Sequence, residues 1–132
     1  MARRTVRRPQ RPAAARPPPD AQVDKAVAAH EHALALWRRG EYRRAGLSSD
    51  RAVALLERAV GPRHPDLASA LNLRASLYLQ ADQPRIALRL YRRAERIVEH
   101  AGDDVDRCVI RAHAGRGAGT ALRVLGRYPD AA

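Results

Sequence analysis

The segment ALALWRRGEYRRAGLSSDRAVALLE at residues 33–57 is followed 42 residues later by ASLYLQADQPRIALRLYRRAERIVE at residues 75–99. The matched positions of the first segment are Ala33, Leu36, Gly40, Tyr42, Ala45, Ala52, Leu55 and Glu57. Their counterparts in the second are Ala75, Tyr78, Asp82, Pro84, Ala87, Ala94, Ile97 and Glu99. A shorter third copy follows after a further 44 residues, with Gly119, Leu122, Gly126, Tyr128 and Ala131. Recurrence at one period of this length predicts an array of similar structural units.

Each unit has the hydrophobic pattern of two helices joined by a tight turn. In the second unit, Leu67, Leu71, Ala75 and Tyr78 are spaced to share one helical face. We expect an all-α chain, with helices near residues 22–39, 43–60, 66–81, 85–101 and 105–125. Stacked as antiparallel pairs they form an α-solenoid of units at about 24–65, 66–104 and 105–132, the last one incomplete.

Several residues fit the ends of these helices and the contacts between them. Asp66 follows Pro65, where a carboxylate satisfies free N–H groups at a helix start, and we expect His64 to act in local capping. Gly40 and Gly126 suit the left-handed conformation that ends a helix. Small residues predict a close approach of paired helices; they are Ala33, Ala75, Gly119, Ala45, Ala87 and Ala131.

The chain is strongly basic, with 25 Lys and Arg against 14 Asp and Glu in 132 residues, a formal net charge of +11. Residues 1–20 hold six arginines, five prolines and one acid, which favours a disordered arm. One interpretation of this arm is an electrostatic clamp on nucleic acid through Arg3, Arg4, Arg7, Arg8 and Arg11. The alternative is a solvated leader without a partner, since no base-stacking aromatic residues are interleaved with the charges.

No catalytic or metal-binding constellation stands out, and we expect no enzyme activity, no metal and no cofactor. The single cysteine, Cys108, excludes an internal disulfide framework and has no base nearby in the sequence. His30 and His32 lie two residues apart, so one helix would point them in different directions. Asp103, Asp104 and Asp106 fit the first turn of a helix better than an acid/base site. The glycines at 115, 117 and 119 match no phosphate-binding loop and weaken the fifth helix.

The repeated pattern resembles a known family. Gly40-x-Tyr42-x-x-Ala45 with Ala52, and Gly126-x-Tyr128-x-x-Ala131, resemble the turn and second helix of tetratricopeptide repeats. The segment GPRHPDLA at residues 61–68 resembles the roughly 42-residue repeats of the kinesin light chain type, which also occur in bacterial regulatory and scaffold proteins. HEAT-like repeats have a similar length but do not predict the Gly-x-Tyr-x-x-Ala turn.

Four positions depart from the family pattern. Arg74 stands where the family has a buried Leu, which implies a rotated helix or an arginine that extends to solvent. Ser48 and Ser49 replace an apolar and an aromatic residue, and this weakens the second helix of the first unit. Pro84 replaces the turn Tyr.

The resemblance implies that the first helix of each unit lines a concave binding surface. Carried over in register, the inward positions are His30, Leu34, Trp37, Arg38, Ser69, Asn72, Ser76, Gln80, His113, Arg116, Thr120 and Arg123. Trp37 is a candidate aromatic anchor, and the Asn72 amide can pair with both N–H and C=O of an extended peptide. The implied ligand is an acidic or carboxylate-ending peptide held by arginines. The alternative is that these side chains only face solvent.

The leading hypothesis is therefore a non-catalytic scaffold for protein–protein interaction, cytoplasmic and without a membrane span. The truncated third unit suggests a fragment of a larger regulatory protein, and self-association through the open helix 105–125 is a further possibility. A nucleic-acid-associated factor that uses the arm is the competing hypothesis.

Overall fold

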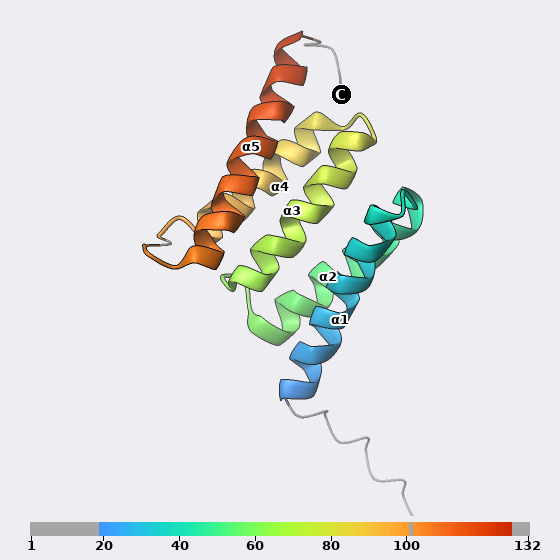
Figure 1. The fold of residues 1–132 in the computed structure, drawn as a ribbon, viewed down its shortest axis with the longest axis vertical. Coiled ribbons are helices and arrows are strands. Elements are labelled where there is room, and N and C mark those ends of the chain that lie inside the picture. The colour runs from blue at the N-terminus through green and yellow to red at the C-terminus, as the bar shows by residue number, and fades with distance from the viewer. Residues whose placement is uncertain (1–18, 101, 128–132) are drawn as a thin grey trace, which may run out of the picture.

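The computed structural model describes residues 19–100 and 102–127, and within them every regular element is an α-helix. The helices are α1 (Pro19–Arg38), α2 (Tyr42–Val60), α3 (Pro65–Gln80), α4 (Pro84–Ile97) and α5 (Val105–Arg127). They form two layers, with α1, α3 and α5 parallel in front and α2 and α4 antiparallel behind them (Figure 1). The expected all-α solenoid of antiparallel pairs is confirmed, and α1 begins at Pro19, inside the expected arm.

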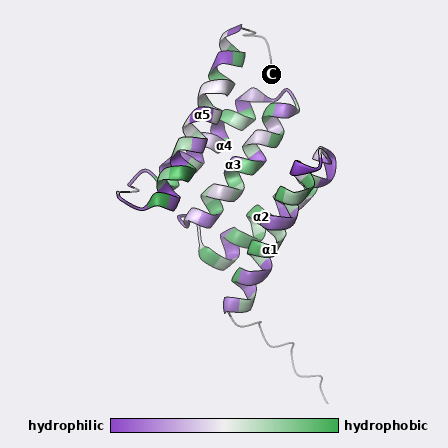
Figure 2. Ribbon diagram, viewed as in Figure 1, coloured by the Kyte–Doolittle hydropathy of each residue, from purple (hydrophilic) through white to green (hydrophobic). Residues whose placement is uncertain are grey.

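Small buried residues bring the helices of each pair together. Ala33 and Ala45 are completely buried between α1 and α2, and Ala75 and Ala87 are completely buried between α3 and α4. Hydrophobic and hydrophilic residues alternate around the helices, as an amphipathic array requires (Figure 2). Of the other small residues expected at these contacts, Gly119 has open space beside it and Ala131 lies outside the described residues.

The turns of the two helix pairs are equivalent. The Gly40 N–H donates to the carbonyl of Trp37 at 3.0 Å, and the Glu41 N–H donates to that of Leu36 at 3.0 Å. This pair of bonds is a Schellman motif, with Gly40 at φ +78° in the left-handed position.

In the second pair, the Asp82 N–H donates to Leu79 at 3.3 Å and the Gln83 N–H donates to Tyr78 at 2.9 Å. Asp82 takes the left-handed conformation at φ 57°. Pro84 then begins α4. Proline fits this position because a backbone N–H in the first turn would have no hydrogen-bond acceptor within the helix. The 42-residue register therefore holds at the level of individual hydrogen bonds.

Two sequence expectations about helix ends are wrong. Gly126 does not end a helix in the left-handed conformation, because α5 continues through it to Arg127. A helix accepts an internal glycine at a cost of about 1 kcal/mol relative to alanine. Helix α4 ends at Ile97 rather than near 101, where the Val98 N–H is shared between the carbonyls of Ala94 and Glu95 and the chain turns toward α5.

Residues that depart from the family pattern are accommodated locally. Arg74 is partly buried, pairs with Asp50 of α2 at 2.7 Å and lies over the Tyr78 ring, 5.8 Å from its centroid. Its charge is therefore paired at the contact between α2 and α3 while part of the side chain stays exposed. Ser49 is buried within a complete α2, and its Oγ has no hydrogen-bond partner among the described residues. As expected, His64 caps α3, its Nδ1 accepting from the Asp66 N–H at 3.1 Å.

A tight contact between α4 and α5 depends on Gly117. The Tyr91 ring is buried, and its hydroxyl forms a hydrogen bond of 2.7 Å with Ser76 Oγ. A Cβ at Gly117 would overlap the ring carbons of Tyr91, whereas a Cβ at Gly119 would meet nothing within 4 Å. The first glycine is therefore required by packing, and the second is not.

We predict opposite effects of two alanine substitutions that lie two residues apart on α5. Gly117→Ala displaces the Tyr91 ring and lowers the free energy of unfolding by about 1–3 kcal/mol. Gly119→Ala raises it by up to about 1 kcal/mol, because alanine is the better helix former. Urea unfolding followed by circular dichroism measures both. Equal effects of the two substitutions would show that Tyr91 does not pack on Gly117.

Candidate functional site

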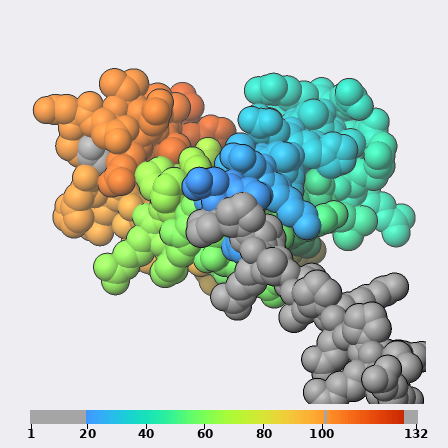
Figure 3. Space-filling model, turned by 90° about the horizontal axis from the view of Figure 1, so that it is seen from below, coloured from blue at the N-terminus to red at the C-terminus, as the bar shows by residue number. Residues whose placement is uncertain are grey.

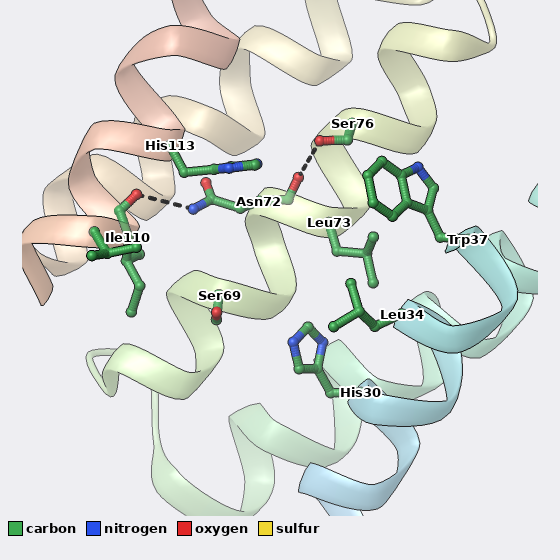
Figure 4. Close-up of a pocket in the computed structure, with 10 residues that line it drawn as sticks. His30, Leu34, Trp37, Ser69, Asn72, Leu73, Ser76, Ile110 and His113 are labelled. Carbon is green, nitrogen blue, oxygen red and sulfur yellow. Dashed lines mark hydrogen bonds between the residues drawn. The ribbon is translucent and has the colours of Figure 1, made fainter. Parts of the chain in front are cut away.

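The N-terminal turns of α1, α3 and α5 lie at the same end of the molecule (Figure 3). Helices α3 and α5 pack on each other, whereas α1 and α3 touch only slightly. A cleft of about 190 Å³ runs across the three helices; its lining comprises His30, Leu34, Trp37, Ser69, Asn72, Leu73, Ser76, Val109, Ile110 and His113. The side chains of α1 face those of α3 across this cleft (Figure 4).

Asn72 is the central polar residue of the cleft floor. Its side chain is 4% exposed, and its Nδ2 donates to the Ile110 carbonyl of α5 at 3.1 Å. Ser76 donates through Oγ to the Asn72 carbonyl at 3.0 Å, one turn earlier on α3 (Figure 4). One amide hydrogen of Asn72 is therefore used to tie α3 to α5, and the Oδ1 acceptor is left without a bond.

Three polar atoms in the cleft lining are buried and have no hydrogen-bond partner among the described residues. They are His30 Nδ1, Trp37 Nε1 and Asn72 Oδ1. Buried polar groups in folded proteins are almost always hydrogen-bonded to protein or to water. Trp37 Nε1 is a donor only and Asn72 Oδ1 an acceptor only, so unpaired groups of both kinds lie in the cleft wall.

Both imidazoles of the cleft have a lowered pKa. Burial lowers the pKa of His30 from its usual 6.5, and nearby Asp66 and Glu31 oppose this shift without reversing it. Burial lowers the pKa of His113, and the positive charge of Arg116 lowers it further. The cleft lining contains neither arginine nor carboxylate, so its polar groups are hydroxyl, amide, indole and imidazole groups.

The structure brings together only part of the inward set expected from the sequence. His30, Leu34, Trp37, Ser69, Asn72, Ser76 and His113 line the cleft. Arg38 and Gln80 are exposed outside its lining, at or near the C-terminal ends of α1 and α3. Arg116, Thr120 and Arg123 lie along α5 beyond the lining, linked by hydrogen bonds from Thr120 Oγ1 to the Arg116 carbonyl and from Arg123 to Thr120 Oγ1.

Three lining residues are absent from the sequence-based set. Leu73 is one position from Asn72 and adds an apolar wall, and Val109 and Ile110 lie one turn before His113 on α5. The four-residue spacing of Val109 and His113 was available as a signal for a shared face. The arm arginines Arg3, Arg4, Arg7, Arg8 and Arg11 lie outside the described residues.

Two further sequence expectations concern reactive and metal-binding groups. Cys108 is partly buried on α5 as a free thiol, and its Sγ donates to the Gly102 carbonyl at 3.4 Å. Within residues 19–100 and 102–127, no group of three or more His, Cys, Asp or Glu side chains is arranged to hold a metal ion. In the same ranges, no helix combines the length and apolar character that a membrane crossing needs.

The repeat identity follows from the two equivalent hairpins and from a comparison with known families. A family model described as tetratricopeptide repeat matches residues 24–100. The chain belongs to the tetratricopeptide repeat family. The more specific resemblance to repeats of the kinesin light chain type stays a prediction. None of the curated proteins compared with the chain matches it. Tetratricopeptide repeats generally mediate protein–protein interaction and generally form a non-catalytic scaffold.

The buried His30 gives a testable pH dependence of stability. Because its pKa is lowered in the folded state, the unfolded chain binds more protons once the pH falls below about 6.5. The free energy of unfolding therefore decreases as the pH falls from about 7 to about 5. We expect His30→Gln to reduce this decrease and His32→Gln, at an exposed position of the same helix, to leave it unchanged. Urea titrations at several pH values measure it, and identical pH slopes in the two variants would contradict the prediction.

Proposed function

We propose that this tetratricopeptide repeat protein binds an extended segment of a partner protein in the cleft between α1, α3 and α5. The observation that carries the proposal is the set of buried cleft atoms without partners, His30 Nδ1, Trp37 Nε1 and Asn72 Oδ1. An extended peptide presents alternating N–H and C=O groups, which match the acceptor of Asn72 and the donor of Trp37. A buried donor or acceptor without a partner is costly in free energy, so a ligand that forms a hydrogen bond with it gains affinity.

The apolar part of the cleft favours a hydrophobic side chain on the bound segment. Leu34 and Leu73 lie on facing helices, and the Trp37 ring stands beside them (Figure 4). Buried aromatic residues are frequent anchors of protein interfaces, and Trp37 is the candidate here. Val109, which is 61% exposed, adds apolar surface on the opposite side of the cleft. We propose a peptide with one apolar anchor residue between hydrogen-bonding backbone groups.

The acidic character expected of the ligand depends on arginines at the ends of the cleft. Arg38 and Arg116 lie outside the lining, and Arg116 is near enough to His113 to influence its pKa. An acidic residue or terminal carboxylate beyond the anchor would meet these guanidinium groups. Within the proposal, hydrogen bonds and the anchor supply most of the affinity, and the arginines select among ligands by charge.

A peptide-display selection on the full-length chain tests this function. We expect enriched peptides to share an apolar anchor, and Trp37→Ala to weaken their binding about tenfold or more. Because Trp37 is partly buried and its loss can also affect folding, Val109→Arg serves as a second variant that fills the cleft from an exposed position. Leu47→Arg, at a 70% exposed leucine on α2 outside the cleft lining, is the matched control.

Fluorescence anisotropy with the enriched peptides gives the dissociation constants, and circular dichroism verifies that each variant is folded. The proposal predicts weaker binding by both cleft variants and unchanged binding by Leu47→Arg. Binding that is insensitive to a folded Val109→Arg variant, or equally sensitive to Leu47→Arg, would place the interaction elsewhere on the chain.

A further inference from the structure

The outer surface of α4 consists of arginine. The exposed positions of this helix are Arg85, Arg89, Arg92 and Arg96. Their intervals of four, three and four residues place them within an arc of about 60° and along about 16 Å of the helix axis. The remaining positions of α4 are buried or partly buried against the rest of the fold. We call these four residues the arginine stripe.

The arginine stripe is specific to α4 and does not follow from the repeat. At the equivalent positions of α2, 42 residues earlier, the residues that correspond to Arg89, Arg92 and Arg96 are Leu47, Asp50 and Ala54. The exposed surface of α2 is therefore of mixed charge and polarity, although both helices occupy the same layer of the solenoid (Figure 1). A general bias toward arginine in the chain would affect both helices.

Three arginines of the stripe form no ion pair within the described part of the fold. Arg89, Arg92 and Arg96 make no ion pair or hydrogen bond with the described residues, whereas their neighbour Arg93 is paired with Glu57 of α2. Like charges one turn apart repel each other, so the grouping of these arginines on one face is unfavourable for α4 in the absence of an anionic partner.

The adjoining surface extends the positive charge toward α5. Arg111 of α5, together with Arg92 and Arg96, lines a depression of about 390 Å³. Glu95 and Glu99 also line this depression, so its charge is mixed at the α5 side. The continuous part of the positive surface is the row from Arg85 to Arg96.

We propose that the arginine stripe binds the phosphate backbone of duplex nucleic acid. Guanidinium groups form paired hydrogen bonds with phosphate oxygens, and a duplex presents one negative charge per about 1.7 Å of its axis. A row of about 16 Å therefore faces several phosphates at once. Contacts of this kind are insensitive to base sequence.

The composition of the stripe favours a duplex over other anionic partners. No exposed position of α4 is aromatic or aliphatic, so the helix offers no ring for stacking unpaired bases. It also offers no apolar anchor of the kind that dominates protein interfaces or inserts into a lipid surface. Helix α4, which carries the stripe, lies in the layer behind α1, α3 and α5 (Figure 1), the three helices that line the cleft. The proposed role of the stripe does not depend on the peptide-binding function.

Three full-length variants with the same change in charge test the proposal. The stripe variant carries R85Q, R89Q, R92Q and R96Q. The α2 control carries R43Q, R44Q, R51Q and R58Q, at four exposed arginines of the equivalent helix. The arm control carries R3Q, R4Q, R7Q and R8Q. Fluorescence anisotropy measures the binding of a labelled DNA duplex, and of one of its strands alone, at several salt concentrations.

We expect the stripe variant to bind the duplex at least about tenfold more weakly than the wild type at about 0.1 M salt, with a log–log salt slope shallower by about 3. Both controls keep a slope within about 1 of the wild type, and the single strand binds more weakly than the duplex. The stripe variant keeps its helical circular dichroism and melts no earlier than the wild type, because like-charge repulsion in α4 is relieved.

Other outcomes would overturn the proposal. Equal losses in the three variants would show that only net charge matters, and a loss confined to the arm control would place binding in residues 1–20. An unaffected stripe variant, or no duplex binding by the wild type, would contradict it directly. Displacement of the duplex by polyglutamate at equal charge, tighter binding of the single strand, or equal binding to anionic lipid vesicles would assign the stripe to another class of partner.

Discussion

The fold depends on the absence of side-chain bulk where paired helices cross. Ala33 with Ala45, and Ala75 with Ala87, are completely buried at corresponding points of the two hairpins. Protein interiors are packed as densely as organic crystals, so even one added methylene at such a point separates the helices or strains them. The position of each helix, and with it the direction in which its inner face points, follows from these contacts.

The cleft arises where the contacts between neighbouring inner helices differ. Asn72 joins α3 to α5 through the Ile110 carbonyl, whereas the residue 42 positions earlier, His30, makes no such bond to α3 and its Nδ1 is unpartnered. Helices α3 and α5 pack together, while α1 and α3 touch only slightly. At the same position of the repeat, Asn72 thus joins α3 to α5, whereas His30 makes no such link between α1 and α3. The cleft between α1 and α3 has apolar walls formed by Leu34 and Leu73.

The sequence predicts the parts of this structure that depend on local pattern. Helix periodicity and the turn residues placed the five helices within a few residues, and the 42-residue register anticipated that Gly40 and Asp82 occupy equivalent turns. Contacts between distant residues are different, because no local pattern encodes them. Gly117 was expected only to weaken α5, yet it makes room for Tyr91.

Part of the cleft lining was also predictable from the local sequence pattern. The repeat register assigned seven of its lining residues, because inward positions recur with the helical period. It also assigned Arg116, Thr120 and Arg123, which continue the same face of α5 past the point where the facing helices form a wall. The use of Asn72 as a tie to Ile110, 38 residues away, required the three-dimensional contact.

The cleft and the arginine stripe of this repeat protein differ in charge. The cleft lining is free of arginine and carboxylate, and burial lowers the pKa of both its histidines, so the hydrogen bonds and apolar contacts proposed there would depend little on salt. The arginine stripe is exposed on the outer layer, where a Debye length of about 8 Å at physiological ionic strength screens any interaction strongly. If both proposals hold, salt would weaken the contact of the stripe with a charged polymer much more than the contact of the cleft with an apolar anchor.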